Sequence, residues 1–408
     1  MKTSWNSITF ENAIEFTQIG IVRNKKEQSP DFEYRYFKMN NIKNTNGIDE
    51  TSFAFINASE EEVTKYKLFE GDFLFNTRNS FELVGKSCLY RSNYNIPTLF
   101  NNNILRVRFN SNFLPTFVSY AFSCKEIREK LKKMKSGTTS VVGIYYKSLR
   151  KLILPQPTLT EQKRIVAKLD KCFEAIDKAR ANVENNLQNA KDLFQSQLSQ
   201  MFSQKGDGWV EKKLNEICEI KGRIGYRGYT KGDLVDKGEG AITLSPSNIT
   251  DNVFNTRKCT YISWFKYNES PEIMVFNGDI LFVKTGSTYG KVALVKDLKE
   301  KATINPQFVV LKDIQIQNAF LYYYLTTHEF KEKIENIVGG TATPTLSQTN
   351  LGNQSISYPH DSEQKVISEK LNQLGIGINK IKLEYDKKLN DLEELKKSIL
   401  QKAFNGEL

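Results

Sequence analysis

The chain has 408 residues, 39% of them hydrophobic, and a formal net charge of +11. This length predicts two or three domains, and the apolar content excludes a disordered chain. No apolar run is long enough to span a bilayer. Because the N-terminal residues lack a secretory signal pattern and the five cysteines lack metal-ligand or redox spacing, we expect a cytoplasmic protein with buried thiols.

The positive charge is concentrated in the first part of the chain. Residues 1–159 hold 23 lysine and arginine residues against 15 aspartate and glutamate residues. Such a surplus is typical of a domain that binds a polyanion such as nucleic acid. Charge alone equally fits a basic protein without such a partner.

Residues 1–159 form the first predicted domain, and their pattern is that of short strands. The runs YRYFKM, FAFI, DFLF and ILRVRF are bounded by glycine, asparagine and aspartate, as is typical of strands joined by turns. A helical pattern follows at 114–135 and is expected to stop at Gly137.

Residues 160–204 are predicted to form a long helix, because apolar residues recur in steps of three and four without an interrupting proline. Residues 205–361 predict a second strand-rich domain with a helical pattern at 318–338, and residues 362–408 predict a second long helix. Thr160 and Ser362 are the candidate N-caps of the long helices. The predicted helix seam consists of Ile165, Leu169, Ile176, Leu187, Ile367, Leu371, Ile378 and Leu389.

The second half of the chain repeats the first. Residues 161–202 align with residues 363–404 at a constant offset of 202 positions, without a gap. The repeat continues into the predicted domains, where FEGDFLF at 69–75 matches FNGDILF at 276–282 and a Gly-Lys pair follows each. The sequence therefore indicates a tandem duplication of a globular unit followed by a long helix.

The linkers predict that the two long helices are antiparallel. Each helix would be about 60 Å long at 1.5 Å per residue, whereas a domain of about 157 residues is only about 40 Å across. The second domain joins the end of the first helix to the start of the second, so these two ends must meet at one domain. We therefore expect an α+β protein in which two similar strand-rich domains are joined by an antiparallel coiled coil with internal pseudo-twofold symmetry.

This layout resembles the DNA sequence-specificity (S) subunit of Type I restriction-modification systems, in which two target recognition domains alternate with two long helices. The resemblance covers essentially the whole chain. It rests on the Gly-Asp turn before each buried strand, on the Gly-Lys pairs at 85–86 and 290–291, and on the proline and Glu-Gln before each long helix. The last motif is looser in the second copy.

The resemblance implies that each target recognition domain reads one half of a bipartite, asymmetric DNA target, and that the helices set the spacing and dock modification subunits. It implies a non-catalytic chain with no catalytic residue, metal site or cofactor of its own. The implied partners are double-stranded DNA, two modification (methyltransferase) subunits and two restriction (endonuclease and translocase) subunits. S-adenosylmethionine, ATP and magnesium are then expected in those partner subunits.

Two motifs approach catalytic signatures without completing them. Residues 80–87 have the Gly-Lys-Ser tail of a P-loop but serine in place of its first glycine. The Asn-Pro-Gln-Phe run at 305–308 is similar to an amino-methyltransferase motif, but no glycine-rich cofactor loop accompanies it. Neither His328 nor His360 has a counterpart in the other repeat. We therefore predict turns at both motifs and no duplicated histidine centre.

Base and phosphate contacts call for arginine, lysine, amide and hydroxyl side chains on loops. Such side chains gather after each Gly-Asp strand, in a glycine-flanked threonine loop of each half, and at 223–229, where basic and aromatic residues alternate. The candidate DNA-binding residues are Thr77, Arg78, Asn79, Lys284, Ser287, Tyr289, Thr138, Thr139, Thr341, Arg223 and Arg227. For each of them the alternative is an ordinary turn or surface role.

Two other functions stay open at this point. A non-catalytic coiled-coil adaptor that binds protein partners would show a DNA affinity that does not fall as salt rises, and an enzyme would show turnover by the purified chain. Apolar residues off the seam are expected either to be buried under the domains or to dock partner subunits. These residues are Val166, Phe173, Leu193, Phe202, Leu383, Leu395 and Leu400.

Overall fold

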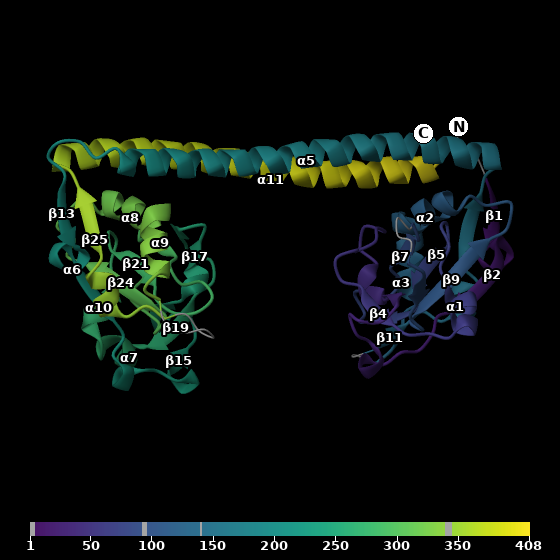
Figure 1. Cartoon of the computed structure of the whole chain (residues 1–408), viewed down its shortest axis with the longest axis horizontal. Coiled ribbons are helices and arrows are strands. Elements are labelled where there is room, and N and C mark those ends of the chain that lie inside the picture. The colour runs from purple at the N-terminus through teal and green to yellow at the C-terminus, as the bar shows by residue number, and fades with distance from the viewer. Residues whose placement is uncertain (1–4, 92–95, 139–140, 339–344) are drawn as a thin grey trace. The chain divides into compact units, whose positions relative to one another are not determined.

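The computed structural model of the chain describes residues 5–91, 96–138, 141–338 and 345–408. Its contacts divide the chain into two compact units, the first of residues 1–183 and 387–408 and the second of residues 184–386. Each unit consists of one strand-rich globular part and one segment of each long helix (Figure 1). Both units mix helices and strands, which confirms the predicted α+β class.

The two long helices are α5 (Leu159–Ser203) and α11 (Asp361–Phe404). Thr160 and Ser362 lie inside them, so both N-cap predictions are wrong. Each helix begins one residue before its predicted range, at Leu159 and at Asp361. At α5, the Thr158 hydroxyl accepts a hydrogen bond from the N–H of Glu161 (3.3 Å).

Within each unit the segments of α5 and α11 lie side by side and run in opposite directions (Figure 1). In the first unit Lys396 pairs with Asp177 (2.9 Å) and Glu393 pairs with Arg180 (2.5 Å), so the numbers fall along α11 as they rise along α5. In the second unit the end of α5 and the start of α11 share one hydrophobic core. The predicted antiparallel pairing is confirmed.

The globular part of the first unit is built on a four-stranded antiparallel sheet in the order β2-β9-β5-β7. A three-stranded sheet, β4-β3-β8, contains a parallel pair, and β1 pairs with β12. The strands are β1 (Asn6–Thr9), β2 (Ile14–Ile19), β3 (Tyr34–Phe37), β4 (Ala54–Ile56), β5 (Phe73–Asn76), β6 (Arg78–Asn79), β7 (Ser87–Leu89), β8 (Thr98–Phe100), β9 (Ile104–Phe109), β10 (Ser136–Gly137), β11 (Val142–Gly143) and β12 (Ile153–Gln156). The short helices are α1 (Glu60–Tyr66), α2 (Pro115–Ser123), α3 (Lys125–Lys133) and α4 (Tyr146–Leu149).

The globular part of the second unit repeats this arrangement. Its four-stranded antiparallel sheet has the order β14-β24-β21-β22, its second sheet, β15-β19-β16-β23-β20, holds the equivalent parallel pair, and β13 pairs with β25. The strands are β13 (Val210–Lys213), β14 (Glu219–Gly222), β15 (Leu234–Val235), β16 (Gly240–Leu244), β17 (Ile249–Thr250), β18 (Val253–Phe254), β19 (Thr260–Ser263), β20 (Met274–Val275), β21 (Ile280–Val283), β22 (Val292–Leu294), β23 (Ala302–Ile304), β24 (Phe308–Lys312) and β25 (Ser355–Tyr358). The short helices are α6 (Leu214–Ile217), α7 (Trp264–Asn268), α8 (Asn318–Thr326), α9 (His328–Glu335) and α10 (Gln348–Gly352). The two globular parts therefore share one fold, as the duplication predicts.

The Gly-Asp turn, one of the closest sequence matches, makes the same hydrogen bond in both copies. The Asp72 carboxylate accepts from the N–H of Phe69 (2.9 Å), and the Asp279 carboxylate accepts from the N–H of Phe276 (2.9 Å). The glycine before each aspartate has a positive φ, of 86° and 100°, which glycine adopts without strain. The turn leads into the central buried strand of each sheet, β5 or β21.

The helices predicted at 114–135 and 318–338 are each two helices in the structure. Cys124 is extended (ψ 145°) and separates α2 from α3, while Thr327 (ψ 153°) separates α8 from α9. The Thr327 hydroxyl then caps α9 by accepting from the N–H of Phe330 (3.2 Å). Gly137 is not a helix stop, because it lies in strand β10.

A buried glutamine joins each globular part to the start of a long helix. Gln162 accepts a hydrogen bond from the N–H of Leu114 (2.8 Å), directly before α2, and donates to the carbonyl of Pro157 (3.0 Å). Gln364, 202 positions later, makes the two equivalent bonds before α8 and α11, at 2.9 and 2.8 Å. These bonds give a physical reason for the repeated Glu-Gln at the start of each long helix.

The predicted seam residues differ in burial along the helices. Four of them, near the helix starts, belong to the cores of the globular parts: Ile165 and Leu169 in the first, and Ile367 and Leu371 in the second. Ile165, Leu169, Ile176, Ile367 and Leu371 are buried, whereas Leu187, Ile378 and Leu389 are half-buried. Off the seam, Val166, Phe202 and Leu400 are buried, Phe173 is half-buried, and Leu193, Leu383 and Leu395 are exposed.

Candidate nucleic-acid interface

In the first unit, two of the predicted loops are joined by one small sheet. Strand β6, which follows the buried strand β5, pairs with β11, and β11 pairs with β10. The loop after the Gly-Asp strand thereby lies beside the threonine loop, where the N–H of the exposed Thr138 donates to the carbonyl of Val141 (3.1 Å). Thr139 lies outside the described residues. Sequence reasoning proposed these loops separately, and the structure brings them together.

The Arg78 side chain is exposed to solvent, whereas the side chains of Thr77 and Asn79 form hydrogen bonds inside the protein. The Thr77 hydroxyl donates to the carbonyl of Asn103 (3.0 Å). The Asn79 amide donates to the side-chain oxygen of Asn76 (3.0 Å), and its own oxygen accepts a backbone N–H (2.9 Å). Thr77 and Asn79 therefore shape the turn that holds Arg78.

A cleft of about 410 Å³ opens beside Arg78. It is lined by residues of four segments, at 19–22, 77–78, 102–105 and 144–146. Tyr145 is 50% exposed, and the guanidinium carbon of Arg78 lies 5.8 Å from the centroid of its ring. Sequence reasoning missed Tyr145 and Tyr146, although two adjacent tyrosines directly after the threonine loop were a usable signal.

The same backbone frame carries different side chains in the second unit. The N–H of Lys284 donates to the carbonyl of Gln307 (2.8 Å), as the N–H of Thr77 donates to that of an asparagine in the first unit (2.8 Å). Lys284 is therefore the equivalent of Thr77, and Thr285 occupies the position of Arg78. Thr285 forms an isolated bridge with Thr345, as Arg78 pairs within its own sheet.

The candidate residues of this second loop differ in their surroundings. Lys284 is half-buried, and burial lowers the pKa of its ammonium below the usual value. Among the described residues its ammonium has no hydrogen-bond or ion-pair partner, which leaves it able to take an anion. Ser287 is exposed, and Tyr289 packs against the hydrophobic core. Thr341 lies outside the described residues.

The third predicted loop is corrected at Arg223. Its side chain is only 6% exposed and donates to the carbonyl of Ile304 (3.1 Å), the hydroxyl of Thr303 (3.2 Å) and the carbonyl of Arg227 (3.3 Å). A guanidinium already satisfied inside the protein supports the loop and does not face a ligand. Arg227 is half-buried beside Tyr226, which is 81% exposed.

The two near-catalytic motifs are turns. Lys86 donates to the carbonyls of Met39 (3.0 Å) and Ile42 (2.5 Å), so its ammonium is already bound by the backbone. The Asn305 side chain accepts the N–H of Gln307 (3.0 Å). In the described part of the chain no group of three or more His, Cys, Asp or Glu residues is placed to hold a metal. None of the helices described there is both long and apolar enough for a membrane span.

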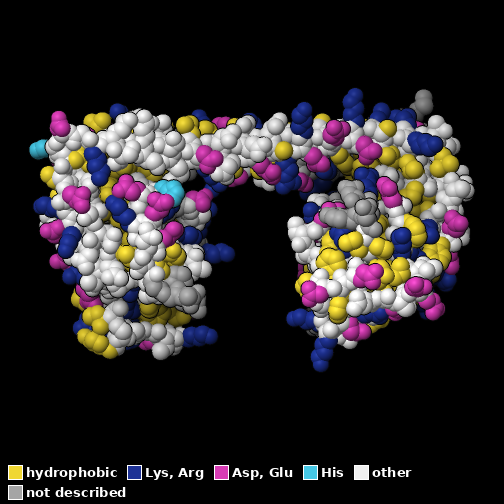
Figure 2. Space-filling model, viewed as in Figure 1, with side chains coloured by type: hydrophobic (Ala, Val, Ile, Leu, Met, Phe, Trp, Pro, Cys, Tyr) yellow, Lys and Arg dark blue, Asp and Glu magenta, His cyan; other side chains and the backbone are white. Residues whose placement is uncertain are grey.

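The face drawn in Figure 2 shows no continuous strip of positive charge. Dark blue Lys and Arg side chains are interspersed with magenta Asp and Glu side chains over both globular parts, and hydrophobic side chains gather between them on the first (Figure 2). Mixed charge of this kind gives weak steering of DNA to that face. On this face, charge alone does not mark an interface.

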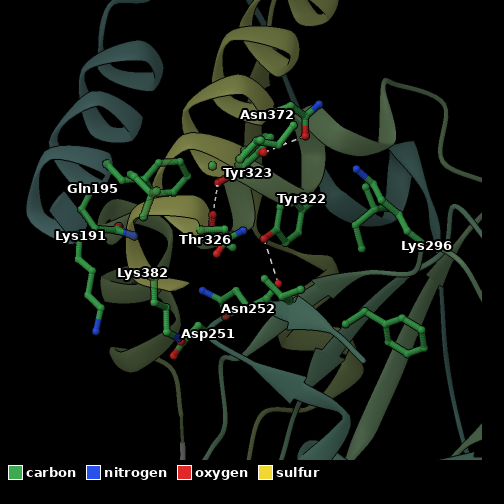
Figure 3. Close-up of a pocket in the computed structure, with 18 of the residues that line it drawn as sticks. Lys191, Gln195, Asp251, Asn252, Lys296, Tyr322, Tyr323, Thr326, Asn372 and Lys382 are labelled. Carbon is green, nitrogen blue, oxygen red and sulfur yellow. Dashed lines mark hydrogen bonds and ion pairs between the residues drawn. The ribbon is translucent and has the colours of Figure 1, made fainter. Parts of the chain in front are cut away.

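The second unit also holds a cavity of about 610 Å³, lined by α5, α11, α8 and the β17–β18 hairpin (Figure 3). The hydroxyl of Tyr322 donates to the carbonyl of Asn252 (2.9 Å) in the hairpin, and Lys382 of α11 pairs with Asp251 beside it. No candidate DNA-binding residue lines the cavity. It is therefore a feature of how the hairpin rests on the helices, separate from the candidate interface.

A family model described as the Type I restriction modification DNA specificity domain matches residues 14–187 and 206–394. The chain belongs to this family. Each match covers most of one globular part and runs into the long helix that follows it, so this specificity subunit contains two copies of the family domain.

Two relatives and one solved structure extend the likeness along the chain. The Type I restriction enzyme MjaVIII specificity subunit of Methanocaldococcus jannaschii is 22% identical over 306 residues, which cover 71% of this chain and 70% of the relative. The putative type I restriction enzyme MjaX specificity subunit of the same organism is 25% identical over 381 residues, which cover 88% and 84%. A chain from a structural study of complex assembly and conformational transition of the type I R-M system is 19% identical. It has a TM-score of 0.76 over 100% of this chain and 99% of that one, which shows the same fold.

The predicted resemblance is confirmed, and the chain is a non-catalytic specificity subunit that carries DNA sequence recognition. The enzyme and adaptor alternatives give way to this assignment. The individual DNA-binding residues stay predictions. Among the candidate cations, Arg78 is exposed, and the half-buried ammonium of Lys284 has no hydrogen-bond or ion-pair partner among the described residues.

Proposed function

We propose that this specificity subunit reads a bipartite, asymmetric DNA target, with one half-site bound by each globular part. The supporting observation is that one fold occurs twice while equivalent loop positions carry different side chains. Arg78 corresponds to Thr285, and Tyr145 corresponds to Ser347. One fold can approach the same kind of DNA groove twice, and different side chains select different bases.

The long helices would set the spacing between the half-sites. Each globular part shares its core with both helices and is tied to a helix start by a buried glutamine. Such attachments resist sliding of a globular part along its helix segments. A fixed number of unread base pairs between the half-sites is the expected consequence.

The helices would also dock two modification subunits, with two restriction subunits completing a complex that acts on DNA in the cytoplasm. S-adenosylmethionine, ATP and magnesium would be bound by those partners. The support in this chain is a set of large apolar side chains exposed on the helices, since exposed apolar patches are typical of interaction sites. They include Leu193, Ile376, Leu383 and Leu395.

Docking can be tested at Leu383, which is 72% exposed. Leu383→Glu places a charge on this surface and is expected to reduce co-purification of the modification subunit at least tenfold, without lowering the unfolding temperature. Val210→Glu is the matched control, because Val210 is exposed on β13 outside the helices. Equal co-purification of both variants would contradict docking at this surface.

The proposed target is tested by sequencing methylated bases in cells with and without this chain. The expected result is one bipartite adenine-methylation motif, of two different half-sites and a fixed spacer, that is lost with the chain. A contiguous motif, or no change in methylation, would contradict the proposal. Binding of the purified complex to its site should also weaken steeply as salt rises.

A further inference from the structure

The two recognition loops can be compared position by position, because their backbones make the same hydrogen bonds. The N–H of Ile144 donates to the carbonyl of Thr77 (2.9 Å), and the N–H of Leu346 donates to that of Lys284 (2.9 Å). The residues that follow in each strand are then equivalent. The first unit presents an arginine and a tyrosine where the second presents a threonine and a serine.

The backbone of Arg78 is fixed from two sides. The amide of Asn76, which is fully buried, donates to the carbonyl of Arg78 (3.0 Å). Arg78 is also paired with Gly143 across the small sheet. The start of the arginine side chain is therefore held in place by groups inside the protein.

The Tyr145 ring lies against Gly143, the residue that pairs with Arg78. A Cβ added to Gly143 would come within 3.1 Å of the Tyr145 ring, so the ring packs directly on the glycine that pairs with Arg78. The Arg78 guanidinium carbon lies 5.8 Å from the centroid of that ring. A cation over an aromatic face is attracted to it, which narrows the conformations that Arg78 samples.

The guanidinium itself is unused. Arg78 is exposed, and within the described residues no hydrogen bond or ion pair engages its N–H groups. The cleft beside it has apolar walls from Ile19, Val22 and Leu105. A preorganised arginine with free donors is the side chain that reads guanine best, through a bidentate pair to its O6 and N7 atoms.

We propose that Arg78 reads a guanine in the half-site of the first globular part, and that Tyr145 is the positioning residue that orients it. The inference rests on the proposed function and adds a base identity to it. Because the second globular part has Thr285 and Ser347 at the equivalent positions, its half-site is not read by an arginine there.

The test uses the complex of the full chain with its modification subunit. Affinity is measured for the cognate duplex and for duplexes in which each base pair of the first half-site is replaced in turn. Wild type should discriminate by about 5- to 150-fold at the guanine, and Arg78→Ala should lose discrimination at that position only. Arg150→Ala is the matched control, because Arg150 is a half-buried arginine that pairs with Glu11 (3.2 Å) and does not line the cleft.

Tyr145 is tested through Arg78. Tyr145→Ala should weaken discrimination at the same base, Tyr145→Phe should retain it, and the Arg78→Ala, Tyr145→Ala double variant should be no worse than Arg78→Ala alone. If Tyr145 only stabilised the fold, Tyr145→Ala would weaken discrimination at every position of the first half-site, and its effect would add to that of Arg78→Ala. Discrimination in the second half-site reports that each variant is folded.

Two outcomes separate this inference from the function on which it rests. Unchanged discrimination by Arg78→Ala at every position, with a normal bipartite site for wild type, would overturn the guanine assignment alone. A wild-type complex without a bipartite site would overturn the proposed function and this inference together.

Discussion

Buried polar side chains hold the loops of both globular parts, and they recur at equivalent positions. The amide of Asn41 donates to the carbonyls of Asp49 (3.1 Å) and Ser52 (3.2 Å). The amide of Asn248, its counterpart in the repeat, likewise donates to two carbonyls, at 3.1 and 3.0 Å. A buried amide that satisfies two carbonyls fixes a loop without regular strand pairing. The sequence match between residues 39–42 (MNNI) and 246–249 (PSNI) therefore has a structural explanation in this buried amide.

Gln364 permits a direct test of such a residue. Gln364→Ala would leave the N–H of Gln317 and the carbonyl of Pro359 without their partner. Each unsatisfied buried group costs about 1–3 kcal/mol, so we expect a loss of about 3 kcal/mol, seen as a lower unfolding temperature. Gln373→Ala is the control, because Gln373 is exposed on the same helix. Equal unfolding temperatures of the two variants would rule out the structural role.

Lys284 should make stability depend on pH. Burial lowers the pKa of this lysine in the folded state, whereas the unfolded chain keeps a value of about 10.4. Folding therefore favours release of its proton, so its destabilising effect is complete below the folded-state pKa and fades as the pH rises to the unfolded value.

Lys284→Met removes this effect and is expected to raise the unfolding temperature at pH 7, with the gain shrinking toward pH 10. The variant should also weaken binding of the second half-site, because it removes a cation of the candidate interface. Lys296→Met, at an exposed lysine, is the control for loss of one positive charge. A gain in stability that stays constant across this pH range would contradict the explanation by burial.

At the scale of elements, α11 differs from α5 through glycine. In the alignment of the two repeats, Gly375 corresponds to Phe173 and Gly377 corresponds to Ala175. In the first unit the Phe173 ring packs edge-on against Tyr120 (5.5 Å between centroids). In the second unit Gly375 has no side chain to fill this space, and it lines the 610 Å³ cavity of Figure 3. The cavity thus follows from a local difference between the two copies.

Gly377→Ala is expected to stabilise α11. A Cβ at Gly377 would meet nothing within 4 Å, and alanine is favoured over glycine inside a helix by about 1 kcal/mol. The unfolding temperature should rise by about 2–4 °C, with unchanged DNA binding. Gly240→Ala should do the reverse, because its Cβ would lie 2.0 Å from the carbonyl oxygen of Ile262. A lower unfolding temperature for Gly377→Ala would show that the glycine is needed.

The sequence predicted the elements that have a long or repeated pattern. The apolar spacing predicted both long helices, the linkers predicted their antiparallel pairing, and the Gly-Asp match located the central strand of each sheet. The breaks at Cys124 and Thr327 were not predicted, because neither position carries the glycine or proline that usually indicates the end of a helix. The burial of Arg223 was equally hidden, since its partners at 303–304 lie far away in the sequence.

At the scale of the whole molecule, each globular part is a separate segment of the sequence, but its hydrophobic core also includes residues of both long helices. The core of the second globular part includes Leu198 and Phe202 of α5, and Ile367 and Leu371 of α11. Phe202 packs against Phe320 of α8, with 5.1 Å between ring centroids. The helices are therefore part of each globular core. Exchange of a globular part between relatives must disturb this shared core.

Replacing residues 205–361 with those of a relative should change only the second half-site of the methylated motif, because the first globular part and both helices stay the same. The spacer length should stay the same as well.

The donor segment would meet foreign helix residues, so we expect the chimaera to unfold at a lower temperature than either parent. A second chimaera that also takes the donor residues at 198, 202, 367 and 371 should recover that temperature and read the same motif. Methylation sequencing gives the motif, and thermal unfolding gives the stability. A changed first half-site in either chimaera would contradict one half-site per globular part, whereas an unrepaired unfolding temperature would contradict only the shared core.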